Sequence, residues 1–292
     1  MLKNTFLHIP GIGPKTERKI WDSGIFAWDE FASENPIHST PKKRGLVAGY
    51  LQESKQHLIS NNPNYFENLL PANLHWRFFP EFRSSAVYLD IETTGLDRHY
   101  ESITTIALYD GESIFHYVRD QNLDDFLNDI QGYKVLITYN GKLFDVPFIE
   151  RYFNIKLDHA HIDLRFILGS LGYKGGLKAC EYQLGIDRGD LQGVDGFFAV
   201  LLWHEYQRNK NKSALETLLA YNIQDVLNLE HLMVTAYNMK IRETPFYESL
   251  QLRSPILPDN PFTVDRDTVE KIKKVNIHHS AGFCSTLDQI KT

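Results

Sequence analysis

Two carboxylates at the end of one apolar segment are the residues of this chain whose types and spacing most clearly suggest chemistry. Asp90 and Glu92 stand two residues apart, so on a strand both side chains point to the same face. Leu89 and Ile91 then point to the opposite face, into apolar packing. Two ionised, partly desolvated carboxylates repel each other unless a cation compensates. The pair therefore indicates a metal site, although two solvated acids at a strand end would show the same spacing.

Two further acids stand in contexts that could bring them to the same place. Asp145 follows a strand-like segment over 134–139 and an Asn-Gly turn, at the start of a helix, where an acid can also be an ordinary cap. Asp225 lies four residues after Tyr221, on the same face of a mostly apolar helix. An unpaired acid there would be costly, and a salt-bridged helix acid is the alternative. Four such acids suit hard cations, which prefer oxygen ligands.

In this order the motifs resemble those of the DEDD (DnaQ-like) 3′–5′ exonuclease superfamily. Asp90-Ile91-Glu92 matches the first motif, and its extension Thr93-Thr94-Gly95-Leu96 also matches. The stretch from Asn140 to Phe144-Asp145 matches the second motif, and Tyr221-x-x-x-Asp225 matches the third in its tyrosine form. The resemblance is strongest to bacterial YprB-like ribonuclease H-like proteins, and it covers residues 84–237.

The resemblance implies a two-metal mechanism that releases nucleoside 5′-monophosphates from the 3′ ends of DNA or RNA. Two divalent cations, Mg²⁺ or Mn²⁺, would lie about 3.5–4 Å apart. Their ligands would be the four acids Asp90, Glu92, Asp145 and Asp225. Tyr221 would orient the attacking water, because a free tyrosine pKa of about 10 makes it a poor base near neutrality.

The resemblance also implies a pocket for the terminal nucleotide. Its residues would be Thr93, Thr94, Leu96, Asn140 and Phe144. Leu96 would act as an apolar wedge against a base, and Phe144 would stack on one. Core packing alone could also explain Leu96 and Phe144. Asp163 is expected to be structural or to support the metal ligands, without binding metal itself.

The elements that must position these residues follow an α/β pattern. Strands are expected over 85–92, 103–109, 113–118, 134–139 and 159–163, and helices near 122–130, 146–153 and 213–237. An antiparallel meander followed by alternating strands and helices predicts a ribonuclease H-like mixed five-stranded sheet flanked by helices. The expected divisions are a helical N-terminal region (1–80), the exonuclease domain (81–240) and a loop-rich C-terminal tail (241–292).

A second motif stands near the N-terminus. Residues 6–21 resemble a helix-hairpin-helix motif, whose turn is formed by Pro10-Gly11-Ile12-Gly13-Pro14. The resemblance implies that Gly11 and Gly13 let backbone N–H groups approach a nucleic-acid phosphate. Lys15, Arg18 and Lys19 would add attraction that does not depend on base sequence. A tight turn that only packs a helical hairpin onto the nuclease domain is the alternative.

Composition excludes several classes of protein. The chain has 292 residues, of which 42% are hydrophobic and 23% charged, as in a globular protein with a proper core. No apolar run approaches the ~20 residues that cross a membrane, and no secretory signal begins the chain, so the cytoplasm is the expected location. Cys180 and Cys284 are too few for a disulfide framework, and His159, His161 and His204 lack zinc-ligand spacing.

Two other functions remain compatible with these patterns. One is an endonuclease of the ribonuclease H type with a similar fold and metals; the helical Tyr221/Asp225 motif favours the exonuclease. The other is a non-catalytic nucleic-acid-binding protein that uses the helix-hairpin-helix motif. The complete set of four acids disfavours it. The net charge of −6 weakens general DNA binding, but it does not exclude a nuclease whose own site contains acids.

Overall fold

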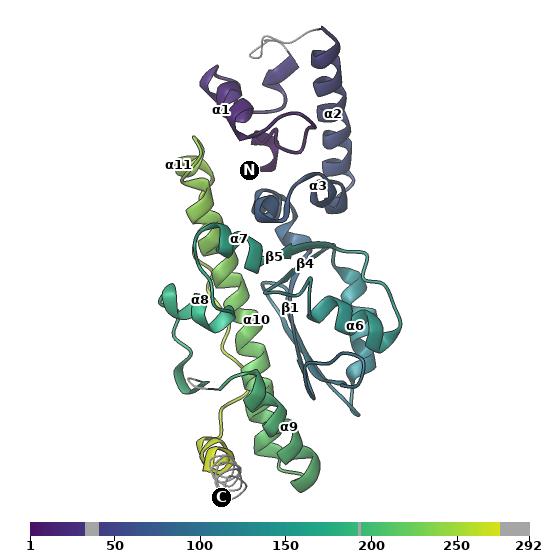
Figure 1. The fold of residues 1–292 in the computed structure, drawn as a ribbon, viewed down its shortest axis with the longest axis vertical. Coiled ribbons are helices and arrows are strands. Elements are labelled where there is room, and N and C mark those ends of the chain that lie inside the picture. The colour runs from purple at the N-terminus through teal and green to yellow at the C-terminus, as the bar shows by residue number, and fades with distance from the viewer. Residues whose placement is uncertain (33–40, 192–193, 275–292) are drawn as a thin grey trace, which may run out of the picture.

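A mixed five-stranded sheet lies at the centre of the molecule (Figure 1). The computed structural model describes residues 1–32, 41–191 and 194–274, and Cys284 lies outside this part. The strands are β1 (Ala86–Thr93), β2 (Ile103–Tyr109), β3 (Ile114–Val118), β4 (Val135–Thr138) and β5 (Ala160–Asp163). Their order is β3-β2-β1-β4-β5; the β1–β2 and β2–β3 pairs are antiparallel, and the β1–β4 and β4–β5 pairs are parallel. The predicted fold class is confirmed.

The central strand β1 separates two apolar layers by the alternation of its side chains. Val87, Leu89 and Ile91 pack in one core cluster with α6 (Asp145–Phe153). Tyr88 packs on the opposite face, in the cluster that includes much of α10 (Lys212–Ile241). Because side chains alternate with a period of two, Asp90 and Glu92 continue the face of Tyr88, toward α10. Figure 1 shows α10 and α6 on opposite sides of the sheet.

The long helix α10 owes its length to its sequence and its burial. It contains no Gly or Pro over its 30 residues, and the side chain of Asn211 caps its start by accepting a hydrogen bond from the Ser213 amide at 3.1 Å. It packs against β1, β2 and α9 (Gly196–Asn209), so most of its faces are buried. Two short helices, α7 (Leu164–Ser170) and α8 (Leu177–Gln183), complete this side of the sheet.

One predicted helix is only partly α-helical. The segment expected as a helix near 122–130 consists of a 3-10 turn (Leu123–Asp125), one α-turn in α5 (Phe126–Asp129) and a second 3-10 turn (Ile130–Gly132). Its apolar side chains Leu123, Phe126 and Ile130 are buried against the sheet and fix its position.

The N-terminal region is helical, as expected, and a buried ion pair joins its first helix to its last segment. Its helices are α1 (Pro14–Asp22), α2 (Pro41–Ile59), α3 (Pro63–Leu69) and α4 (Phe79–Phe82). In α1, Glu17 forms an ion pair with Arg77 (3.0 Å between Oε2 and Nη2) and also accepts hydrogen bonds from Thr5 Oγ1 and the Phe6 amide. These donors compensate the burial of the carboxylate and fix the hairpin relative to the segment that leads into β1.

The segment after α10 contains more helix than a loop-rich tail would. It begins with α11 (Tyr247–Leu250), and a helical stretch covers 266–274. Val269 and Ile272 of this stretch are buried in a cluster with residues of α9 and α10. The sequence does not indicate the helical stretch 266–274, because the chain just before it is interrupted by Pro245, Pro255, Pro258 and Pro261. Within the described part of the chain, no helix is long and apolar enough to cross a membrane.

Candidate active site

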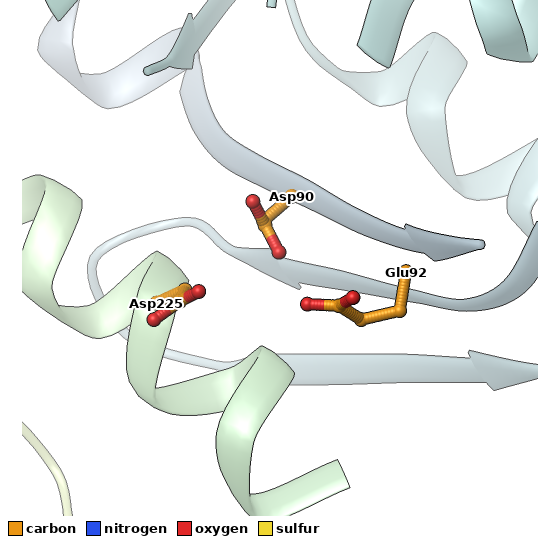
Figure 2. Close-up of side chains that lie close together, drawn as sticks. All are labelled: Asp90, Glu92 and Asp225. Carbon is orange, nitrogen blue, oxygen red and sulfur yellow. The ribbon is translucent and has the colours of Figure 1, made fainter. Parts of the chain in front are cut away.

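Three carboxylates from two distant elements converge on one point. Asp90 and Glu92 project from β1, and Asp225 projects from α10, which crosses that face of the sheet. Each offers an oxygen atom, and these atoms all lie within 4.8 Å of one another. Figure 2 shows the three carboxylates pointing into the space between the strand and the helix. An oxygen-only set of this spacing fits a hard divalent cation such as Mg²⁺ or Mn²⁺.

Asp145, the fourth predicted acid, reaches the same cleft from the other side of the sheet edge. It is the first residue of α6 and is buried. Its Oδ1 accepts a hydrogen bond from the Ile91 amide of β1 at 3.2 Å, so the start of α6 is held against the strand that carries Asp90 and Glu92. It lines the cleft with the other acids, but it is not one of the three whose oxygens lie within 4.8 Å.

The acids perturb one another strongly. Burial raises the pKa of Asp90 and of Glu92 well above the usual carboxyl range, and the nearby charge of Asp225 raises both further. Burial likewise raises the pKa of Asp145 to about 7, although its backbone hydrogen bonds act in the opposite direction. Carboxylates in such a cluster bind a proton or a cation at neutral pH. A bound divalent cation would compensate the charge and favour the ionised forms.

A buried amide fixes the orientation of Asp90. Asn222 Nδ2 donates to Asp90 Oδ2 at 2.7 Å, and Asn222 Oδ1 accepts a hydrogen bond from Thr105 Oγ1 of β2 at 3.0 Å. Asn222 is fully buried between α10 and the sheet. Asn222 lies inside the third motif, but the sequence pattern alone gives it no role. Only its position in the fold reveals its contact with the strand acid.

Two cations, Arg188 and Lys178, lie against the acids, although no motif in the sequence marks them. The guanidinium of Arg188 donates to Asp225 and also pairs with Glu181, at 2.7 Å between Nη1 and Glu181 Oε2. Glu181 accepts a further hydrogen bond from Asn228 Nδ2 of α10 at 2.8 Å. Arg188 and Glu181 are both buried, so this pair holds the Asp225 carboxylate in one orientation.

Lys178 of α8 contacts the predicted tyrosine. Its ammonium group donates to the Tyr221 hydroxyl and lies 4.3 Å from the centre of the Tyr221 ring. Burial raises the pKa of Tyr221, and the charges of Asp225 and Glu92 raise it further. The hydroxyl therefore stays protonated at neutral pH. Lys178 also acts on Glu92, since its positive charge partly opposes the rise in the pKa of that carboxyl.

The acids open into a cleft of about 450 Å³ that also contains every predicted pocket residue. These residues are Thr93, Thr94, Leu96, Asn140 and Phe144. Leu96 is 86% exposed, so this side chain does not pack in the core. Phe144 is partly buried against the core cluster that β1 forms with α6, so core packing accounts for part of the position of this side chain. Thr93 and Thr94 shape the turn, because Thr93 Oγ1 donates to the Gly95 carbonyl at 2.6 Å and Thr94 Oγ1 accepts from the Ser102 amide at 3.0 Å.

Phe197 is an aromatic wall of the cleft that the sequence analysis did not single out. It stands in the first turn of α9, whose N-cap is Asp195, and it is 69% exposed. Leu177 and Val200 extend the same apolar wall. A large exposed apolar side chain beside a carboxylate cluster is the kind of surface on which a nucleobase stacks.

The match to a known family covers the elements just described. The RNase_H_2 family of the RNase_H superfamily matches residues 87–237, which is more than half of the chain. The chain belongs to the RNase_H superfamily. The comparison with curated proteins gives no match.

Solved structures give distant likenesses to this RNase_H-superfamily chain. Brucella melitensis NrnC bound to pGG is 17% identical, with a TM-score of 0.39, over 58% of this chain and 79% of that one. A structure described as the apo form of the nuclease is 19% identical, with a TM-score of 0.38, over 55% of this chain and 75% of that one. The family B DNA polymerase of the archaeon Pyrobaculum calidifontis is 11% identical, with a TM-score of 0.36, over 53% of this chain and 29% of that one.

Asp163 supports the second motif of this RNase_H-superfamily domain without joining the carboxylate triad. Asn140 has a left-handed backbone (φ 65°), and the Asp163 carboxylate accepts hydrogen bonds from the amides of Asn140 and Lys142 at 2.8 and 3.1 Å. Gly141 is required in this turn, because a Cβ there would lie 2.3 Å from Thr138 Oγ1. His161 is buried and hydrogen-bonds to Thr138 Oγ1 at 2.8 Å, as expected for a structural histidine.

The predicted phosphate-binding turn lies apart from the cleft. Gly11 adopts a positive φ of 81°, and Gly13 is the N-cap of α1 with Lys15 exposed in its first turn. None of these three residues lines the cleft. The segment before the turn contains only a 3-10 turn (Leu2–Asn4), so the motif has one α-helix where the resemblance implies two.

Proposed function

We propose that the protein is a metal-dependent 3′–5′ exonuclease that releases nucleoside 5′-monophosphates from nucleic acid by a two-metal mechanism. The observation that carries the proposal is the convergence of Asp90, Glu92 and Asp225 in one cleft with Asp145 and Tyr221. The sheet and the helix that bring these residues together lie within residues 87–237, the region that matches the RNase_H superfamily. The DEDD tyrosine form and the relation to YprB-like proteins belong to the same proposal.

The side chains of the cleft divide the work of phosphodiester hydrolysis. Divalent cations bound by the four acids would polarise the attacking water and stabilise the charge that develops on the phosphate. Tyr221 stays protonated and can orient that water through its hydroxyl group. Lys178 places a positive charge beside Tyr221 and Glu92, where it faces the developing negative charge. Asn222 and Arg188 hold the carboxylates of Asp90 and Asp225 in place.

The size and walls of the cleft favour an exonuclease over an endonuclease. About 450 Å³ lies within the range of about 300–1,000 Å³ that is usual for small-ligand sites. Leu96 and Phe197 offer exposed apolar surface for one terminal base, while Thr93 and Asn140 offer polar groups for its sugar and phosphate. An endonuclease would need an open groove that receives the middle of a strand.

A digestion panel tests the proposal directly. Single strands, duplexes and hybrids of DNA and RNA, labelled at either end, are incubated with Mg²⁺ or Mn²⁺. We expect 3′-labelled strands to release labelled mononucleotide at once and 5′-labelled strands to shorten one nucleotide at a time. Internal cuts in both would indicate the endonuclease, and binding without any digestion would indicate a non-catalytic protein.

We also propose that the hairpin turn binds a phosphate of the nucleic acid, through backbone amides near Gly11 and Gly13 and the side chain of Lys15. Gly13 is the cleaner probe, because its backbone is extended and a Cβ there would meet nothing within 4 Å. Gly13→Val should lower the melting temperature only slightly, as expected for a changed N-cap, and should weaken the affinity for single strands. Lys15→Gln should lower the slope of log affinity against log salt by about 0.7 for single strands, the value for one neutralised phosphate. An unchanged slope would mean that the turn only packs.

A further inference from the structure

A second pocket adjoins the catalytic cleft. It has a volume of about 720 Å³ and is lined by Tyr139, Asn140, Arg165, Gly169, Tyr173, Lys174, Gly175 and Gly176. Tyr139 and Asn140 also line the cleft of the four acids. The two hollows therefore share a wall.

The charges of the two hollows are opposite. Four acids line the cleft, whereas the residues that line the second pocket include two cations and no acid. Arg165 and Lys174 are both exposed, and neither forms an ion pair with a carboxylate in the part of the chain that the structure describes. Asn140 Oδ1 accepts one hydrogen bond from Arg165 Nη1 at 2.5 Å and so fixes the guanidinium at the shared wall. The other N–H groups of the Arg165 guanidinium remain available for an oxyanion.

The lining of the second pocket suits a sugar-phosphate backbone. A Cβ placed on Gly169 or Gly176 would meet nothing within 4 Å, so the backbone is uncovered there. Gln183 Nε2 donates to the Lys174 carbonyl at 2.9 Å and holds the loop that carries this lysine. The rings of Tyr139 and Tyr173 are half-buried and supply aromatic surface. Cations beside aromatic rings are the combination with which proteins bind single strands without base specificity.

We propose that this second pocket binds the nucleotide on the 5′ side of the scissile phosphate, with Arg165 and Lys174 on its phosphate. The inference rests on the proposed exonuclease function. In that reaction the water oxygen bonds to phosphorus and the bond from phosphorus to the 3′ oxygen of the preceding nucleotide breaks. That oxygen takes up a proton, and the terminal nucleotide leaves as its 5′-monophosphate. The preceding nucleotide must therefore lie directly beside the cleft, where this pocket is.

Salt-dependent binding tests the proposed contacts. Affinity for a fluorescent single-stranded oligonucleotide is measured in the inert Asp90→Asn background, with and without the additional pair Arg165→Gln and Lys174→Gln. Loss of the cations on this one phosphate should lower the slope of log affinity against log salt by about 0.7, the value for one neutralised phosphate of a single strand. The charge-conserving pair Arg165→Lys and Lys174→Arg should keep the slope of the parent.

A matched control removes the same charge elsewhere. Lys156 and Arg253 are exposed and line neither hollow, so Lys156→Gln with Arg253→Gln should leave the slope unchanged. An unchanged slope in the pocket variant would overturn the proposal, and so would an equal fall in the control. The exonuclease function would survive either result if the digestion panel is positive.

A small substrate separates the pocket from the cleft. Thymidine 5′-(4-nitrophenyl phosphate) carries nitrophenol in place of the preceding nucleotide, so it occupies the cleft alone. On an otherwise wild-type chain, Arg165→Gln with Lys174→Gln should leave kcat/KM for this ester within about twofold. The value for an oligonucleotide should fall about tenfold or more, since both cations on the phosphate of the preceding nucleotide are lost. Equal losses on both substrates would place the effect in the cleft and contradict the proposal.

Discussion

Asp90→Asn is expected to lower the single-turnover rate of digestion about a thousandfold while leaving the protein folded. A cation supplies several kcal/mol of transition-state stabilisation in such sites, and about 4 kcal/mol corresponds to about a thousandfold in rate. Asparagine has the same shape as aspartate but removes one charged ligand from the triad. Asn222 can still donate to the amide oxygen of the new side chain, so the relay through Thr105 is preserved.

The choice of Asp90 for this test follows from the surroundings of each acid. Asp225 also pairs with the buried Arg188, so neutralising it would leave an arginine short of a partner and mix a loss of stability with a loss of activity. Asp145 holds α6 to β1 through the Ile91 amide. Asp90 neither pairs with a buried cation nor holds a helix against the sheet, so its substitution reports most directly on the metal site.

The matched control is Asp124→Asn, which makes the same chemical change at an exposed position outside the cleft. It should digest at the wild-type rate. Circular dichroism and thermal melting would show that both variants are folded. If Asp90→Asn keeps a wild-type rate, the carboxylate triad is not the catalytic centre, whatever its spacing.

The sheet and the acids could be predicted because each depends on short-range pattern. The alternation of Leu89, Asp90, Ile91 and Glu92 fixes which side chains share a face, and the structure has that arrangement. The helical spacing of Tyr221 and Asp225 likewise predicts one face of a helix. Both side chains do line the same cleft.

The partners of these acids could not be predicted, because they come from segments without a pattern of their own. Lys178 and Arg188 lie on a seven-residue helix and the loop after it, and only the packing of α8 against α10 brings them to the acids. Phe197 reaches the cleft because α9 begins there. In the sequence each is an ordinary lysine, arginine or phenylalanine. Their roles follow from contacts between residues far apart along the chain.

Divalent cations are expected to stabilise the protein, and to do so much more at pH 8 than at pH 5.5. A cation at one hundred times its dissociation constant adds about 2.7 kcal/mol to the free energy of unfolding. Asp145 has a pKa of about 7 in the folded protein, and the pKa values of Asp90 and Glu92 are also raised. At a pH below these values protons occupy the carboxylates, and each proton must leave before the cation binds. Removing one proton costs about 1.4 kcal/mol for each pH unit below the pKa.

The pH dependence of the metal-free protein needs its sign worked out group by group. The raised carboxyls bind more protons when folded than when unfolded, so the stability they contribute is complete below pH ~4 and is lost as pH rises, for Asp145 through about 7. His8 and His161 act in the opposite direction, because burial lowers the pKa of each to about 3 and stability grows as pH rises toward 6.5. The difference between melts with and without cation cancels the histidines and isolates the acids.

The measurement is therefore the rise in melting temperature caused by Mn²⁺ or Mg²⁺ at a series of pH values. The rise should be largest at pH 8 and should shrink as the pH is lowered toward 5.5. In Asp90→Asn the rise should be smaller at every pH, because one charged ligand is missing, while Asp124→Asn should match the wild type. A rise that is the same at pH 5.5 and pH 8, or the same in Asp90→Asn, would place the cation somewhere other than this cluster.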